Sequence, residues 1–172
     1  MENFIYRRAF ADDIPQIAKV HVESWQKSFR GIAPQEYLDN LSFEKRENSF
    51  RERFGGQEYQ IVIAETAENK IVGFADFGEG RSDQPEYGSE LYAIYLLREF
   101  QGNGIGGNLF KMVANNLREN GLNSIYLQTL KISPYRSFYE KMGGEIIGES
   151  LYKLGDTNFE TIYYGWKDLR RL

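Results

Sequence analysis

The segment that most restricts the fold is QGNGIGG, residues 101–107, which holds four glycines in seven positions. It follows an apolar run, ELYAIYLL at residues 90–97, and precedes a helix-like segment that extends from residue 105 to 120. A strand, a glycine turn and a helix N-terminus together form an anion site, because backbone N–H groups converge there and the helix dipole adds about half a positive charge. The turn therefore predicts an α/β fold that binds a phosphate-containing ligand.

Two common phosphate-binding motifs fit this turn poorly. A Walker A loop ends in Gly-Lys-Ser/Thr, whereas Gly107 is followed by Asn108 and Leu109. Gly102, Gly104 and Gly107 do satisfy G-x-G-x-x-G. However, a dinucleotide fold needs an acidic residue at the end of the next strand, where this chain has LQTLK. A dinucleotide fold would also leave the first 90 residues, with their antiparallel strands, unexplained.

The remaining pattern is that of a mixed α/β chain without repeats. Helical spacing predicts helices at 12–29, around 34–41, at 42–54 and at 134–142, with Asp12 or Asp13 as the N-cap of the first. Alternating or continuous apolar runs predict strands at 4–9, 58–66, 70–78, 90–97, 124–130, 145–154 and 159–166. The turns AEN and GDTN each predict a hairpin. We expect one domain spanning residues 1–172.

Composition excludes several classes of site. The chain has no cysteine and one histidine, which removes disulfides, Cys nucleophiles and Cys- or His-rich metal sites, so no metal is expected. Twenty-five acidic against 21 basic side chains give a formal charge of -4, without a basic cluster for nucleic acid or anionic membrane. This balance mildly favours a small cationic ligand. The N-terminus resembles no signal peptide, and a cytoplasmic location is expected.

The glycine turn, taken with its context, resembles the GNAT superfamily of N-acetyltransferases. Residues 101–106, Gln-Gly-Asn-Gly-Ile-Gly, match the family signature Q/R-x-x-G-x-G/A, which follows the fourth strand and opens a helix. The resemblance implies an α/β (α+β) domain with a central, mostly antiparallel mixed sheet of roughly six to seven strands, splayed between the fourth and fifth. It also implies that the loop holds the pyrophosphate of acetyl-CoA, with contacts from Gln101, Gly102, Asn103, Gly104, Ile105, Gly106 and Gly107.

A second segment, PYRSFYEKMGG at residues 134–144, resembles the later helix of the same family. That helix carries a tyrosine beside the cofactor sulfur, which places Tyr139 in this role. The chain departs from the family at Ile132-Ser133-Pro134, where many members have an asparagine that holds the pantetheine arm. Whether Ser133 makes that contact instead is left open here.

The resemblance also implies a mechanism. A backbone N–H near Leu96 would face the thioester oxygen, and Tyr139 would protonate the leaving thiolate. An alkylamine with a pKa near ~10.4 is neutral in only about one molecule in a few thousand at pH 7, roughly a 4–5 kcal/mol penalty, so a base is needed. Glu90, at the start of the fourth strand, is the first candidate for this base. Asp76, near the end of the third strand, is the second and is also a candidate for binding the acceptor.

The acceptor itself remains open between several classes. The expected reaction is acetyl transfer from acetyl-CoA to a small, cationic primary amine, with Trp25 lining the acceptor site. Asp83, Glu86 and Glu90 fit a cation without choosing one. The alternatives are a protein N-terminal acetyltransferase and a non-catalytic, regulatory module that binds CoA. His21 is expected to be a packed histidine, and the chain could form a homodimer.

Overall fold

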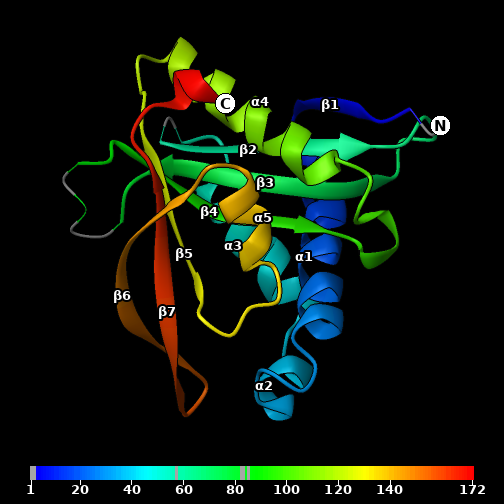
Figure 1. The fold of residues 1–172 in the computed structure, drawn as a ribbon. Coiled ribbons are helices and arrows are strands. Elements are labelled where there is room, and N and C mark those ends of the chain that lie inside the picture. Colours follow the sequence, from blue (N-terminus) through cyan, green and yellow to red (C-terminus); the bar gives the residue numbers. More distant parts are fainter. Residues whose placement is uncertain (1–2, 57, 82–83, 85) are drawn as a thin grey trace.

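A seven-stranded sheet in the order β1-β2-β3-β4-β5-β7-β6 forms the centre of the fold (Figure 1). This computed structural model describes residues 3–56, 58–81, 84 and 86–172. The described sheet is antiparallel at each pairing except that of β4 with β5, which is parallel. This confirms the predicted fold class. The strands are β1 (Ile5–Arg8), β2 (Tyr59–Glu65), β3 (Ile71–Glu79), β4 (Ser89–Leu96), β5 (Ile125–Leu130), β6 (Glu145–Leu154) and β7 (Thr157–Trp166).

Helices cover both faces of the first half of the sheet. Helix α4 packs on one face, and α1 and α3 pack on the other (Figure 1). Strand β2 shows why both faces are covered: Val62 and Ala64 belong to the core beneath α4, whereas Ile61 and Ile63 belong to the core beneath α1 and α3. Alternation of this kind buries apolar area on both sides. The helices are α1 (Ile14–Ser28), α2 (Gln35–Asp39), α3 (Phe43–Arg53), α4 (Ile105–Glu119) and α5 (Arg136–Lys141).

The sheet is splayed between β4 and β5. These strands pair at Glu90 and Tyr126, and the pairing is not continued toward the C-terminal end of β4 in the described register. Strand β4 is also bulged, because Leu91 and Ala93 pair with consecutive residues of β3 and leave Tyr92 as the extra residue. In Figure 1, β5, β6 and β7 run at a steep angle to β1–β4. The predicted splay is therefore present.

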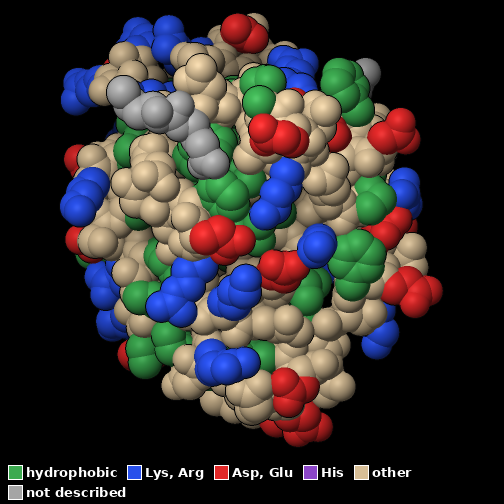
Figure 2. Space-filling model, turned by 90° about the vertical axis from the view of Figure 1, so that its right-hand side faces the viewer, with side chains coloured by type: hydrophobic (Ala, Val, Ile, Leu, Met, Phe, Trp, Pro, Cys, Tyr) green, Lys and Arg blue, Asp and Glu red, His purple; other side chains and the backbone are tan. Residues whose placement is uncertain are grey.

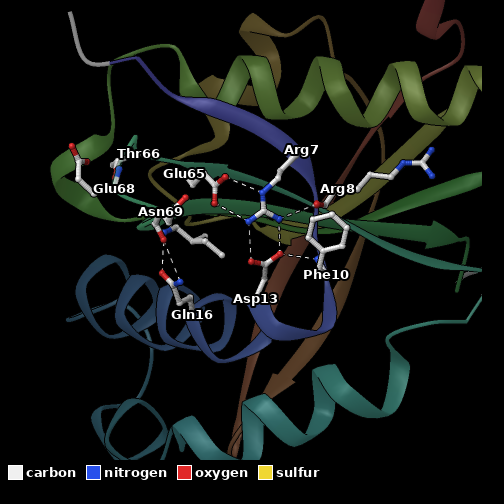
Figure 3. Close-up of polar contacts among 10 residues, drawn as sticks. Arg7, Arg8, Phe10, Asp13, Gln16, Glu65, Thr66, Glu68 and Asn69 are labelled. Atoms are coloured by element: carbon white, nitrogen blue, oxygen red, sulfur yellow. Dashed lines mark hydrogen bonds and ion pairs between the residues drawn. The ribbon is translucent and has the colours of Figure 1, made fainter.

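Helix α1 begins at one of the two predicted N-cap residues, but without the capping hydrogen bond. Asp13 does occupy the N-cap position, but its side chain makes no capping hydrogen bond to α1. Instead it accepts from Arg7 Nη1 at 2.6 Å and Nη2 at 3.0 Å and from the Phe10 N–H at 2.7 Å. Arg7 also donates to Glu65 on β2, so one guanidinium joins β1, β2 and the entry to α1 (Figure 3). The cation outcompetes the helix N–H groups for this carboxylate.

The surface shows no concentration of one charge on the face drawn in Figure 2. Lys and Arg side chains are interspersed there with Asp and Glu, and hydrophobic side chains lie scattered between them. Such mixing gives that face no single-sign field to attract a polyanion. No helix in the described part of the chain is both long and apolar enough to cross a membrane.

Candidate functional site

A groove of about 360 Å³ runs beside the glycine turn, and we name it the glycine-loop groove. Gly102 and Gly104 adopt left-handed backbone with φ of +81° and +77°, and a Cβ at either position would meet no atom within 4 Å. The first intrahelical bond of α4 runs from Asn108 N to Gly104 O. The preceding N–H groups of the first turn thus have no partner within the helix. The groove is lined by Ser24, Ser28, Phe29, Ile94, Tyr95, Leu96, Phe100, Gln101, Gly102, Gly104, Ile105, Gly106, Gly107, Thr129, Ser133, Tyr135, Phe138 and Tyr139.

These features fit a pyrophosphate. The open space above Gly102 and Gly104 lets a ligand approach the backbone, and the unpaired N–H groups and helix dipole favour an anion there. Gly106 has a different role, because its Cβ would meet Phe138 Cε2 at 3.2 Å and Leu96 Cδ1 at 3.3 Å. It allows α4 to pack closely against β4 and α5. Asn103 donates at 3.4 Å to Phe100 O and to Gln101 O, and so holds the turn itself.

Leu96 lies at the open edge of β4. The N–H of the next residue, Leu97, donates to Val72 O on the β3 side at 2.9 Å. Because N–H groups alternate between the two edges of a strand, the Leu96 N–H is directed to the β5 side, into the splay. The Leu96 carbonyl accepts from Ser24 Oγ at 3.1 Å and from Gln101 Nε2 at 3.3 Å. Gln101 therefore ties the glycine turn to the end of β4.

Tyr139 and Ser133 both reach the glycine-loop groove from the α5 side. Tyr139 is half-buried between the rings of Phe138 and Tyr164, with centroids at 5.4 Å and 5.7 Å. Burial, followed by the nearby Tyr164, raises the pKa of Tyr139 well above its ordinary value, so its hydroxyl is protonated at neutral pH. Ser133 is buried, and its Oγ accepts from Tyr135 N at 3.3 Å.

A second cavity of about 260 Å³ lies on the other side of the splay, and we name it the aromatic pocket. Seven of its lining residues are Phe, Trp or Tyr, and seven more have charged, imidazole or amide side chains. Trp25 is among them, stacked on Phe29 at 4.5 Å and donating from Nε1 to Tyr95 OH at 2.7 Å. The lining is His21, Trp25, Phe29, Tyr37, Arg46, Phe50, Arg53, Asp76, Arg81, Glu90, Tyr92, Ala93, Tyr95, Gln128, Thr129, Leu130, Tyr152, Leu154 and Thr161.

The two candidate carboxylates lie in this pocket with different surroundings. Glu90 is buried, and its Oε2 accepts from Arg81 N at 2.9 Å, Arg81 Nε at 3.1 Å and Tyr126 OH at 2.8 Å. Its Oε1 accepts from Arg81 Nη2 at 2.7 Å. Glu90 thus accepts four hydrogen bonds, about as many as a carboxylate can accept. Glu90 anchors Arg81 and the segment that follows β3.

Asp76 has a free carboxylate oxygen. It is 3% exposed, and its Oδ2 accepts from Tyr59 OH at 2.7 Å, with Arg53 Nη1 at 3.9 Å. The other oxygen, Oδ1, is buried and has no hydrogen-bond partner among the described residues. Burial raises the pKa of Asp76, against the opposing influence of Tyr59 and Arg53. The result is a carboxylate that is more basic than usual.

A small junction of about 40 Å³ lies between the two cavities. Tyr95 and Thr129 line the junction, the glycine-loop groove and the aromatic pocket alike. Tyr139 lines the junction and the groove, whereas Tyr92 and Ala93 line the junction and the aromatic pocket. Of the predicted site residues, Tyr139 lines the junction, whereas Asp76, Glu90 and Trp25 line the aromatic pocket next to it.

The sequence interpretation missed the basic residues of the aromatic pocket. Arg46 and Arg53 lie with Phe50 at helical spacing on one face of α3, and that spacing is the signal that could have identified them. Arg81 was missed because its role depends on Glu90 across the hairpin. His21 is buried as expected, yet it also lines the pocket. Glu86 forms an ion pair with Lys167 at 2.9 Å, and Asp83 is outside the described residues.

Comparison with known proteins gives one consistent match. Residues 26–156 match the family model described as an acetyltransferase (GNAT) domain. YuaI of Bacillus subtilis strain 168, described as an uncharacterised N-acetyltransferase, is 34% identical over 96% of this chain and 94% of its own length.

Solved structures share the fold. A GCN5-related N-acetyltransferase from Rhodopseudomonas palustris has a TM-score of 0.76 at 17% identity, covering 96% of each chain. The PaiA N-acetyltransferase from Thermoplasma acidophilum, solved in complex with coenzyme A, has a TM-score of 0.69 at 20% identity. The match covers 95% of this chain and 99% of the PaiA chain.

Proposed function

The chain belongs to the GNAT family and is an N-acetyltransferase that uses acetyl-CoA, and from this premise we propose that it acetylates the primary amine of a small molecule by direct attack. The observation that carries the proposal is the passage itself: two cavities on opposite sides of the splay meet at the junction. One holds the acetyl donor and the other the amine.

The glycine-loop groove is the proposed donor site. The N–H groups at the start of α4 bind the pyrophosphate, with Gly102 and Gly104 leaving room for it. Acetyl-CoA supplies an activated acetyl thioester. Gln101 holds the end of β4 in place, and the Leu96 N–H is positioned to stabilise negative charge that develops on the thioester oxygen. Ser133 is proposed to contact the pantetheine arm from the α5 side.

Asp76 is the proposed base, with Trp25 lining the space for the amine. Its free Oδ1 accepts a proton from the ammonium, directly or through water, so that the neutral nitrogen forms a bond to the acetyl carbon. Glu90, the other candidate, is engaged by Arg81 and Tyr126 and is proposed to position Arg81. As the carbon–sulfur bond breaks, Tyr139 donates its proton to the leaving sulfur. The acetylated nitrogen loses its second proton to solvent, Asp76 releases the first to solvent, and Tyr139 recovers one from solvent.

The test measures free thiol released from acetyl-CoA in the presence of a panel of small amines and one peptide with a free N-terminus. Acetyl-CoA binding is measured in parallel by calorimetry. We expect amine-dependent release with small amines and its loss in Asp76→Asn. Turnover of the peptide alone would replace the small-molecule proposal by an N-terminal acetyltransferase. Binding without turnover of any amine would favour a regulatory module.

A further inference from the structure

The aromatic pocket carries more positive than negative charge, in a protein whose formal charge is -4. Three arginines, Arg46, Arg53 and Arg81, line it together with two carboxylates, Asp76 and Glu90. An excess of cations inside a small cavity is costly unless something compensates it. The question is therefore which of the three arginines has no anion of its own.

Two of the arginines are already occupied. Arg81 forms its ion pair with Glu90 at 2.7 Å and lies over the ring of Tyr92 at 4.2 Å. Arg53 donates from Nε to Ser49 O at 3.2 Å and lies over Tyr59 at 4.5 Å. It also approaches Asp76 at 3.9 Å. These two account for both carboxylates of the pocket.

Arg46 is the exception. Its side chain is half-buried and lines the pocket, and within the described residues its guanidinium has no hydrogen bond, ion pair or ring contact. A guanidinium offers five N–H donors in a planar fork that suits a carboxylate. An unpaired one in a concave site is thus an available anion-binding group.

Neighbouring groups do not neutralise Arg46. Burial, followed by the fields of Arg46 and Arg53, lowers the pKa of His21 well below its usual value. The ring is therefore neutral, and its buried Nδ1 lacks a partner among the described residues. His21, Arg46 and Arg53 all line the pocket. The charge of Arg46 also acts on Tyr37 and Tyr95, which are uncharged at neutral pH.

Resting on the proposed function, we propose that the acceptor is a small amine that also carries a carboxylate, and that Arg46 binds this carboxylate while the amine faces Asp76 and the junction. An amino acid with an apolar or aromatic side chain has this chemistry. The volume of about 260 Å³ lies near the lower end of small-molecule sites, roughly 300–1,000 Å³, so a single amino acid fits better than a peptide. The ammonium group of such an amino acid is still attracted to the carboxylate of Asp76 in the pocket.

The experiment compares amino acids with their own carboxamides, which keep the side chain and amine and remove only the carboxylate charge. Turnover is followed as thiol release from acetyl-CoA by the full chain. The carboxamide amine is less basic and so more often neutral at pH 7, which gives it the intrinsic advantage. A higher kcat/KM for the free acid, by about tenfold or more, therefore requires recognition of the carboxylate.

Variants at Arg46 identify the group responsible. Arg46→Gln should lower kcat/KM for the free acids about 10- to 100-fold and leave the carboxamides nearly unchanged, and Arg46→Lys should keep part of the preference. The matched control is Arg51→Gln, because Arg51 lies on the same helix in an exposed pair with Glu47 at 2.7 Å. It should leave the preference intact. Thermal unfolding of each variant checks folding.

Two results would overturn the inference while leaving acetyl transfer to small amines standing. One is a preference for carboxamides in the unaltered chain. The other is an equal loss for acids and carboxamides in Arg46→Gln. Failure of the proposed function looks different, because no small amine of either series would then be turned over although acetyl-CoA binds.

Discussion

Two glycines at opposite ends of α4 allow the phosphate assignment to be tested with an internal control. Gly104, at the N-cap, and Gly121, just beyond the C-terminal end, have φ of +77° and +79°, and for both an added Cβ would meet no atom within 4 Å. Replacing either by alanine places an L-residue in left-handed backbone at a cost of roughly 1–2 kcal/mol. For a chain of this length, each kcal/mol lowers Tm by about 2–4 °C. Both variants should therefore lose similar stability.

Acetyl-CoA affinity should separate the two variants. Strain at Gly104 is relieved by a shift in backbone angle, which misdirects the N–H groups of the loop, whereas strain at Gly121 acts at the far end of the helix. Loss of one charge-assisted hydrogen bond, about 1.5–3 kcal/mol, raises Kd about 10- to 100-fold for Gly104→Ala. Gly121→Ala should keep the Kd of the unaltered chain.

The assay is calorimetric titration with acetyl-CoA, supported by thermal unfolding with and without ligand. A ligand that binds only the folded state raises Tm according to its concentration relative to Kd, so the two readouts must agree. The reasoning is refuted if Gly104→Ala binds acetyl-CoA as the unaltered chain does, or if Gly121→Ala weakens binding to the same degree. The first result removes the phosphate site, and the second makes the effect one of general stability.

Three further variants test the acid, the base and the fold. Tyr139→Phe should lower kcat about 100-fold or more while leaving acetyl-CoA affinity unchanged, measured by steady-state kinetics and calorimetry. Asp76→Asn should abolish turnover. It should also raise Tm, because the raised pKa of Asp76 means that the folded state resists ionisation of this carboxyl. The increase in Tm should grow as pH rises from about 4. Arg7→Met should cost about 3 kcal/mol in urea unfolding, the lower end for a broken buried pair because Arg7 is 28% exposed.

Each of these variants has a distinct contrary outcome. Unchanged kcat in Tyr139→Phe would remove its role as acid. A Tm gain for Asp76→Asn that is the same at pH 4 and pH 8 would show that its charge carries no penalty in the fold. Because the pKa of Asp13 is lowered in the folded state, the charged form of Asp13 stabilises the fold above about pH 4. This stabilisation disappears as pH falls through the pKa of Asp13 in the folded protein, so Arg7→Met should cost less in acid. Lys19→Met, in an exposed pair with Glu23, is the control and should cost less than about 1 kcal/mol.

Features encoded by neighbouring residues were predictable from the sequence. The turn before α4 depends on left-handed backbone at Gly102 and Gly104, which only glycine adopts without strain, so the residues themselves mark it. The hairpin of β2 and β3 and that of β6 and β7 follow in the same way from apolar alternation and a short turn. The splay between the fourth and fifth strands was implied by the resemblance to the family, whereas the order of strands in the sheet came from the structure.

Side-chain partnerships across the fold were not predictable. Asp13 was expected to cap α1, but Arg7 on β1 and Glu65 on β2 become its neighbours only when the sheet forms. The sequence placed Glu90 first and Asp76 second as the candidate base. Tertiary contacts reverse our order, because Arg81 and Tyr126 donate to Glu90, while one oxygen of Asp76 has no hydrogen-bond partner among the described residues. On α3, helical spacing places Arg46, Phe50 and Arg53 on one face, but only the folded structure shows that this face lines a pocket.

The size of the junction bears on how the proposed reaction separates recognition of the donor from that of the acceptor. Its volume of about 40 Å³ exceeds the roughly 10–15 Å³ that a cavity needs to hold one water, so it has room for a group of acetyl size. On the proposed mechanism, the donor is recognised by α4 and its turn, away from the reacting atoms, and the acceptor by the aromatic pocket, whose lining includes residues of α1, α3 and β3. Because α3 does not line the glycine-loop groove, we expect substitution at Arg46 to change the choice of amine without weakening acetyl-CoA binding.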